Sequence, residues 1–173
     1  MKSVIIIILG AGLVSILAGC SSTPVELAPV GPNPHGVGNA ASNGQLEVFS
    51  RLVACTEAEN PIWHQHSAYR IYDLEGRLVK YVGNTTGYYE EDPRVVALPP
   101  GQYRVSARAS DYLRVEVPVT INPGHTTRIH LDGNWKLPND AARQELVSLP
   151  DGNPVGWLEQ DMKPAGSRSG ATQ

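Results

Sequence analysis

The sequence predicts an all-β domain, a seven-stranded antiparallel β-sandwich, from two observations. Apolar and polar residues alternate in several short runs between Gln45 and Asp132, which is the period of strands with one buried face. Turn residues such as Asn122-Pro123-Gly124 separate these runs, and no helical period lies between them. Because a twisted sheet buries its apolar face against a second layer, we expect two packed sheets.

The expected strands cover residues 45–54, 68–74, 78–82, 95–98, 102–109, 113–121 and 127–131. The first four are short apolar runs, with turns at Glu75-Gly76-Arg77 and Pro99-Pro100-Gly101. The last three alternate most clearly: Tyr103, Val105 and Ala107, for example, are separated by Arg104 and Ser106. Pro118 lies inside the sixth run and predicts an edge or a bulge there.

The alternation ends in the segment 133–173, which we expect to be a C-terminal extension. Asn139 is a suitable N-cap for a short helix over residues 140–146. Residues 147–157 are expected to lie back on the domain, and the Gly- and Ser-rich end from Met162 to form a disordered tail.

The first twenty residues carry an export signal. Lys2 precedes an apolar run from Val4 to Ile16, which is too short to cross about 30 Å of hydrocarbon, and Leu17-Ala18-Gly19-Cys20 follows. This pattern resembles a bacterial lipoprotein signal peptide, residues 1–19, ending in a lipobox. The resemblance implies acylation of Cys20, palmitate included, and membrane attachment through the acyl chains. In this family Ser21, in place of Asp, directs the protein to the outer membrane, facing the periplasm. The alternative is a secreted protein with an incidental cysteine.

Residues 20–44 are expected to form a tether between the acylated Cys20 and the sandwich of residues 45–132. The segment carries four prolines and several glycines but few large apolar residues. It would reach roughly 70 Å as polyproline II, or roughly 27 Å as a flexible coil, and so hold the domain off the lipid surface.

Residues 45–132 also resemble the carboxypeptidase regulatory-like domain, a transthyretin-like (prealbumin-like) sandwich related to the PEGA type. The motifs are Tyr69-Arg70-Ile71-Tyr72-Asp73-Leu74-Glu75-Gly76, Leu98-Pro99-Pro100-Gly101-Gln102-Tyr103-Arg104-Val105 and Val117-Pro118-Val119-Thr120-Ile121-Asn122-Pro123-Gly124. The resemblance implies a non-catalytic module, because the regulatory domain has no catalytic residues. Some members of the family are grouped with carbohydrate-binding sandwiches.

Composition and motifs exclude several classes of function. With 14 basic and 17 acidic residues the formal net charge is −3, which argues against nucleic-acid binding. If Cys20 is acylated, Cys55 has no partner for an intramolecular disulfide. None of the hydrolase, metalloprotease, phosphate-loop or dinucleotide motifs occurs, so we expect neither catalysis nor a cofactor.

Three clusters are candidate sites. Cys55, His64 and His66 are possible zinc or copper ligands, although the spacing fits no standard signature, and we favour a buried cysteine with two exposed histidines. Trp63, Tyr88 and Tyr89 are candidates for stacking on sugars, with Trp135 and Trp157 also in expected loops or tail; alternatively these rings cap a small core.

The third cluster is electrostatic. Arg104, Arg108, Arg114 and Arg128 fall on the expected solvent faces of three neighbouring strands and form either a strip for an anionic partner or an ordinary solvated face. The expected function is a non-catalytic binding or structural module of the outer membrane. The alternatives are a carbohydrate or peptidoglycan binder and a scaffold subunit that contacts another envelope protein.

Overall fold

The computed structural model describes residues 23–55, 63–87, 90–138 and 141–159. Within these residues the chain forms thirteen strands and one turn of 3₁₀ helix, Arg143–Glu145, so the all-β prediction is confirmed. The predicted leader 1–19, Cys20 and the predicted tail from Met162 lie outside the described residues. Within the described part of the chain, no helix has the length and apolar character needed to span a bilayer.

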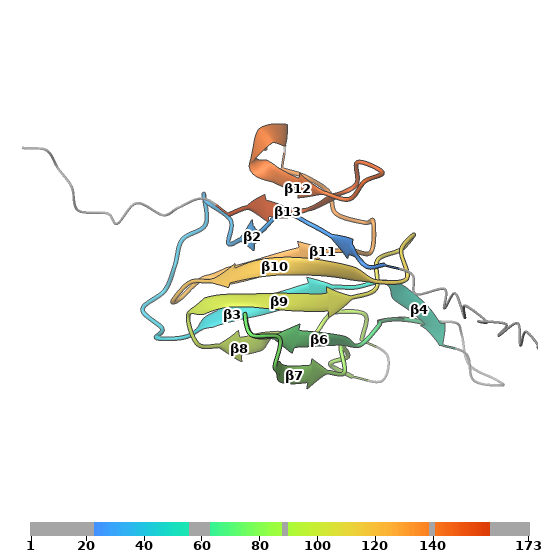
Figure 1. Cartoon of the computed structure of the whole chain (residues 1–173), viewed down its shortest axis with the longest axis horizontal. Helices are drawn as coiled ribbons and strands as arrows, with labels where there is room; N and C mark the ends of the chain where they lie inside the picture. The colour runs from blue at the N-terminus through green and yellow to red at the C-terminus, as the bar shows by residue number, and fades with distance from the viewer. Residues whose placement is uncertain (1–22, 56–62, 88–89, 139–140, 160–173) are drawn as a thin grey trace, which may run out of the picture.

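The larger sheet runs through the middle of the domain (Figure 1). Its path is β12 (Leu146–Ser148), β13 (Pro154–Leu158), β2 (Val30–Gly31), β10 (Val115–Ile121), β9 (Gly101–Ala107), β6 (Tyr69–Tyr72) and β7 (Leu78–Val82), and β1 (Val25–Glu26) also pairs with β10. Ile71, Val105 and Val117 stand opposite one another across β6, β9 and β10 and are fully buried. They mark the core face of this sheet, and the opposite face is turned to solvent.

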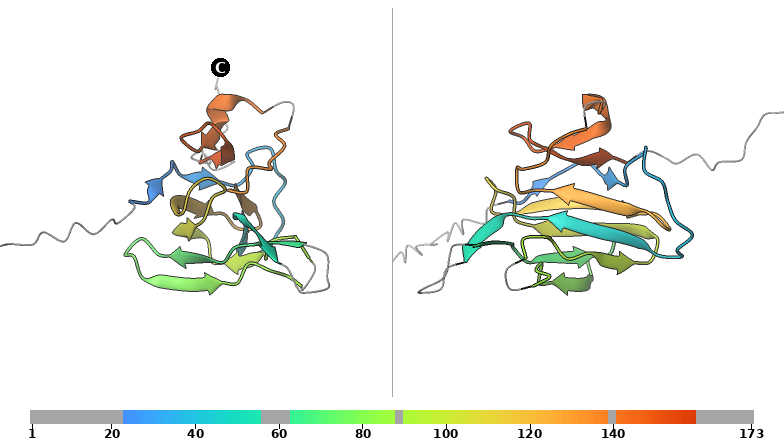
Figure 2. Two further views of the ribbon diagram at one scale, coloured as in Figure 1. Left: turned by 90° about the vertical axis from the view of Figure 1, so that its right-hand side faces the viewer. Right: turned by 180° about the vertical axis from the view of Figure 1, so that it is seen from behind.

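A smaller sheet covers the core face, as Figures 1 and 2 show from opposite sides. Its order is β11 (Thr126–His130), β3 (Gly44–Phe49) and β8 (Val96–Leu98). The fully buried Leu46, Val48 and Ile129 of this sheet belong to the same core as Val105 and Val117. A separate two-stranded ribbon, β4 (Leu52–Cys55) and β5 (Trp63–His66), extends from one end.

The sheets are mixed, so the prediction of a purely antiparallel sandwich is wrong. Strands β1 and β2 run parallel to β10, and β3 runs parallel to β11. Tight turns set antiparallel neighbours, but parallel partners are joined by long stretches of chain and are selected by packing across the whole domain. Local alternation contains no information on that choice.

The expected strand 45–54 is divided between two sheets. β3 ends at Phe49 and β4 begins at Leu52. Between them the buried Ser50 hydroxyl donates to the Ser67 carbonyl at 2.6 Å, and Arg51 N donates to the Arg108 carbonyl at 2.9 Å. These bonds satisfy polar groups where the chain leaves one sheet for the other.

The expected tether contributes to the fold instead of standing clear of it. Val25 N donates to the Arg114 carbonyl at 3.2 Å and Leu27 N to the Glu116 carbonyl at 3.0 Å, while Leu27 and Val30 are buried. Backbone groups alternate in direction along a strand, so the backbone nitrogen of Pro118 points away from β9, toward the gap between β1 and β2. Proline has no N–H, but at this position its absence removes no hydrogen bond between β9 and β10. Strands β1 and β2 are too short to show a period in the sequence, and they form because they pair with a free edge of the sheet.

The expected helix over 140–146 is also replaced. Only Arg143–Glu145 is helical, as a single 3₁₀ turn, and Leu146 begins β12. Seven residues are too few for a stable isolated helix, whereas β12 pairs with β13 and buries Val147 and Leu149. The expectation that residues 147–157 lie back on the domain is confirmed, since β12 and β13 extend the larger sheet.

Candidate anion-binding site

The solvent face of the larger sheet gathers arginines from three adjacent strands. Cross-strand pairing places Arg70 of β6 opposite Ser106 of β9, which stands opposite Glu116 of β10. In the next row Tyr72 of β6 stands opposite Arg104 of β9. Arg108 and Arg114, just beyond the ends of β9 and β10, are exposed on the same face. We call this surface the arginine face: Arg70, Tyr72, Arg104, Arg108, Arg114 and Glu116.

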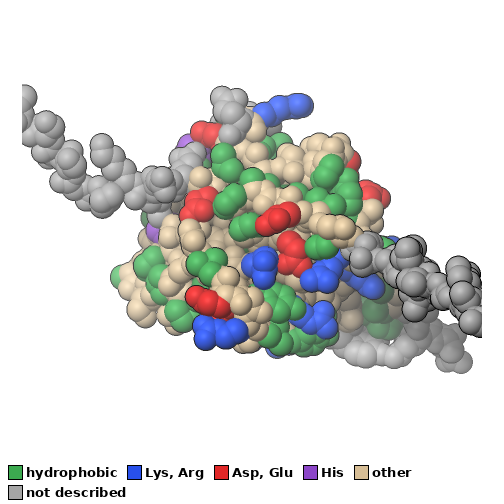
Figure 3. All heavy atoms as spheres, viewed as in Figure 1, with side chains coloured by type: hydrophobic (Ala, Val, Ile, Leu, Met, Phe, Trp, Pro, Cys, Tyr) green, Lys and Arg blue, Asp and Glu red, His purple; other side chains and the backbone are tan. Residues whose placement is uncertain are grey.

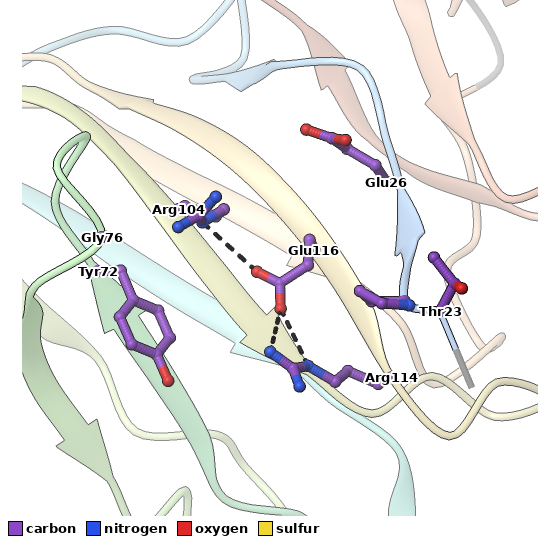
Figure 4. Close-up of a pocket in the computed structure, with 8 residues that line it drawn as sticks. Thr23, Glu26, Tyr72, Gly76, Arg104, Arg114 and Glu116 are labelled. Carbon is purple, nitrogen blue, oxygen red and sulfur yellow. Dashed lines mark hydrogen bonds and ion pairs between the residues drawn. The ribbon is translucent and has the colours of Figure 1, made fainter. Parts of the chain in front are cut away.

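Glu116 organises the centre of the arginine face (Figure 4). Glu116 is only 8% exposed. Its Oε1 accepts hydrogen bonds from Arg114 Nε at 3.0 Å and from Arg114 Nη2 at 2.8 Å. Arg114 Nε is also 3.1 Å from the Ser106 hydroxyl. These charge-assisted bonds fix the guanidinium of Arg114 in one orientation.

Arg104 is less completely paired. Its Nε lies 3.6 Å from Glu116 Oε2, which is an ion pair beyond hydrogen-bonding distance, and this buried nitrogen has no hydrogen-bond partner among the described residues. The Arg104 guanidinium also lies 6.0 Å from the ring centre of Tyr72, and that of Arg70 lies 5.6 Å from the Tyr81 ring. The tyrosines support the arginines without neutralising them, and one carboxylate is shared between Arg104 and Arg114.

Two shallow hollows lie on this face, with volumes of about 390 and 440 Å³. Both are lined by Tyr72 and Arg114; the first also by Thr23, Arg104 and the carboxylates of Glu26 and Glu116, the second by Arg70, Arg108 and Leu113. Figure 3 shows Arg and Lys side chains spread over the same face. Several guanidinium groups around open hollows are suited to phosphate or carboxylate groups on an extended ligand.

Arg128 does not belong to this face. It lies on β11 of the smaller sheet, where its Nε donates to Glu47 Oε2 at 2.7 Å. The predicted four-arginine strip is therefore wrong at this position, because alternation cannot say which sheet a strand joins. Arg70 and Tyr72 take its place. Their alternation with the buried Tyr69 and Ile71 was the sequence signal that could have found them.

Of the three rings predicted to stack on sugars, Trp63, Tyr88 and Tyr89, the structure describes only Trp63. Trp63 begins β5 and is only 9% exposed, and Tyr88 and Tyr89 lie outside the described residues. Because its ring is buried, Trp63 does not offer an exposed face to a sugar.

Other rings form a cluster on the smaller sheet. Trp135 stacks on His130 at 4.5 Å between ring centres, and His130 stacks on Phe49 at 4.4 Å. Trp157 packs edge-on to Trp135 at 6.2 Å. Around Trp135 lies a small pocket of about 180 Å³, the Trp135 pocket, lined by Asn33, Thr126, Arg128, His130, Trp135, Pro138 and Trp157.

The Trp135 pocket is electrically balanced. Arg128 is paired with Glu47, as described above. Burial, reinforced by the charges of Arg128 and His66, lowers the pKa of His130 to about 4, so this imidazole is neutral at neutral pH. The pocket therefore combines aromatic walls with neutral or paired polar groups, unlike the arginine face.

The three proposed metal ligands do not converge. In the β4–β5 pair Cys55 stands opposite Trp63, while His64 stands opposite Ala54, so the thiol and the imidazoles of His64 and His66 lie on different faces. His66 Nδ1 contacts the Ser50 carbonyl oxygen, and Cys55 Sγ is 3.7 Å from Gln65 Oε1. Across the described ranges, no three His, Cys, Asp or Glu side chains are grouped to hold a metal ion.

Comparison of the chain with protein-family models, curated proteins and solved structures found no match.

Proposed function

We propose that this chain is a lipid-anchored protein of the bacterial outer membrane, facing the periplasm, that binds an anionic ligand and catalyses no reaction. The lipobox at Cys20 supports the anchor. The two packed sheets and the Pro-Gly turn motifs support a transthyretin-like sandwich as the scaffold. The observation that carries the binding function is the arginine face. There Arg104 and Arg114 share the buried carboxylate of Glu116, and Arg70 and Arg108 line the adjoining hollow.

The anchor is tested by the substitution Cys20→Ser. Two or more acyl chains give essentially permanent attachment, since each buried methylene contributes about 0.8 kcal/mol. We expect the mass of the mature wild-type chain to include the acyl groups and the variant to leave the membrane fraction. An unmodified wild-type chain in the soluble fraction would disprove the anchor.

Binding is tested on the full acylated chain in phosphatidylcholine nanodiscs. Polygalacturonate, a polymer of carboxylates, is the probe, and neutral dextran is its control. We expect polygalacturonate alone to bind, more weakly at high salt because the contacts are ionic. The double variant Arg104→Gln/Arg114→Gln should bind roughly a hundredfold more weakly, at about tenfold for each charge-assisted contact.

Arg143→Gln is the matched control, because it removes the same charge from an exposed arginine in the 3₁₀ turn beside β12, at the other edge of the sheet. It should leave affinity unchanged. If the double variant binds as tightly as this control, the arginine face is not the binding site.

A second candidate function is binding of a neutral sugar ring in the Trp135 pocket. The observation in its favour is that two indoles and a neutral imidazole line a small pocket together with the polar Asn33 and Thr126. Aromatic faces pack against the apolar face of a sugar, and polar groups orient its hydroxyls. Titration with methyl glucoside and with N-acetylglucosamine tests this function. Trp135→Ala should abolish a signal that Trp63→Phe leaves intact, and absence of binding to both sugars would count against it.

A further inference from the structure

The first described residues lie directly beside the arginine face. Thr23 lines the same hollow as Arg104 and Arg114, and two residues later Val25 begins β1 against β10 (Figure 4). The chain therefore enters the fold at this face and not at the far end of a long tether.

Chain length then limits the distance from this face to the anchor. Cys20 precedes Thr23 by three positions, which span at most about 11 Å of extended chain. The Debye length at physiological ionic strength is about 8 Å, and the headgroup layer itself is several ångströms deep. The arginine face is thus held within range of the charge of the lipid headgroups.

We propose that the arginine face docks on anionic lipid headgroups of the leaflet that holds the acyl chains. This inference rests on the proposed anchor at Cys20 and on the proposed anion binding, and it names the ligand as lipid phosphate. In the docked state the arginine face is turned toward the membrane, and the rest of the domain faces the periplasm.

Charge and apolar exposure both favour this occupant. The arginine face carries four positive charges against the carboxylates of Glu116 and the neighbouring Glu26, so an anionic surface attracts it. The whole chain carries a formal charge of −3, so the more acidic parts of the molecule are repelled. Leu113 is 66% exposed and lines a hollow with Arg108 and Arg114, and Tyr81 beside Arg70 is 59% exposed. Basic side chains with neighbouring Leu and Tyr suit the boundary between headgroups and acyl chains.

The open shape of the hollows agrees with a lipid surface. Arg70, Arg104, Arg108 and Arg114 are spread over three strands instead of converging on one enclosed point. Each basic residue near an anionic leaflet strengthens association by about fivefold, and the anchor supplies a high local concentration of headgroups.

The test measures contact between the face and the lipid. Leu113→Cys, in a Cys55→Ser background, carries a fluorescent label, and a lipid with a spin-labelled headgroup quenches that label at short range. The acylated chain is placed in nanodiscs of phosphatidylcholine alone or of phosphatidylcholine with phosphatidylglycerol. A label at Val37, which is 99% exposed in the segment between β2 and β3, is the control.

We expect strong quenching at position 113 in the anionic discs, at least twofold weaker quenching in the neutral discs, and no difference at position 37. Adding Arg104→Gln/Arg114→Gln should remove the difference at position 113, whereas Arg143→Gln should not. Equal quenching at position 113 in both kinds of disc would overturn the docking.

The two proposals fail in different ways. If the face does not dock but the protein in neutral discs still binds polygalacturonate, the proposed anion binding stands and lipid is not its ligand. If polygalacturonate does not bind and quenching at position 113 is independent of lipid charge, both proposals are wrong.

Discussion

The arginine face lies on the larger sheet alone, whereas the Trp135 pocket lies between β11 of the smaller sheet and β13 of the larger one, and the two are built by different means. On the arginine face, Arg70, Tyr72, Arg104 and Glu116 take their places from the hydrogen-bonded register of β6, β9 and β10. Arg108 and Arg114 lie directly next to the strand ends. In the Trp135 pocket, the rings come from segments far apart in the sequence and meet only through tertiary packing. The first surface is open and charged, and the second is small and electrically balanced.

This difference predicts which property a substitution on each surface will change. A ladder of many backbone bonds tolerates a change of one side chain, so substitutions on the arginine face should alter binding more than stability. A ring cluster that joins β11, β13 and the segment after β11 depends on close packing, so substitutions there should alter stability first.

The largest difference between the two surfaces is expected from Gly156→Ala, which should lower the free energy of unfolding without changing anion binding. A Cβ at position 156 would lie 2.6 Å from Val30 Cγ1 and 3.0 Å from the Arg128 carbonyl oxygen, so β13 must move away from its neighbours. Overpacking of this kind costs roughly 1–3 kcal/mol. Denaturant unfolding should show this loss, and tryptophan fluorescence should report disturbed packing around Trp157. Binding of polygalacturonate should stay within twofold of wild type.

Gly83→Ala is the matched control, because a Cβ there meets nothing within 4 Å. If both variants have wild-type stability, the packing of β13 is not the weak point of this region. If Gly156→Ala abolishes anion binding as well, the two surfaces are not independent.

The next effect is the pH dependence of stability through His130. Its folded-state pKa is about 4, below the ordinary value of 6.5, so the unfolded chain binds more protons between these values. Stability should therefore fall as the pH falls from about 6.5 to about 4. For a half-buried ring the loss is about 2 kcal/mol after allowance for solvent screening.

Unfolding free energies measured at several pH values will check this, with His130→Phe as the comparison. The phenyl ring keeps the stack with Trp135 and Phe49 but does not titrate, so the variant should lose part of the pH dependence in this window. A slope identical to that of wild type would mean that His130 is not the responsible group.

The smallest effect is expected from Glu116→Gln on the arginine face. The amide keeps the size of the side chain but removes the charge that Arg114 and Arg104 share. Both arginines then become available to an external anion, and polygalacturonate should bind several-fold more tightly, roughly 1 kcal/mol. Stability should fall by about 1 kcal/mol or less, since both arginines are partly exposed. Weaker binding would show that Glu116 is needed to position Arg114.

Several strands could be predicted from the sequence alone. Strand β7 has the predicted bounds, although only Val82 of its five residues is buried. Strands β9, β10 and β11 lie within two residues of theirs, because polar and apolar residues alternate along them. Strands β1 and β2 could not be predicted, because two-residue strands contain no period. Strand β12 was not predicted. Leu146 is the last residue of the expected helix, and Val147 and Ser148 were expected only to lie back on the domain.

The candidate site was predictable in part. Arg104, Arg108 and Arg114 were expected on one solvent face and lie there, while Arg128 lies on another sheet. Arg70 and Tyr72 were not recognised, although their strand was. The pairing between Arg104 and Glu116 depends on the register of two strands, and a shift of one residue would send either side chain to the core face.

The sequence by itself determined the all-β class and the inward or outward direction of most strand residues. It also contains the lipobox motif on which the proposed anchor depends. These properties are local, because they depend on alternation over a few residues and on a contiguous motif. Only the tertiary structure decided which strands are neighbours, and therefore that Arg104 and Arg114 share one buried carboxylate and that Thr23 lies beside them. That choice depends on simultaneous packing of residues distant in the chain, which no local pattern records.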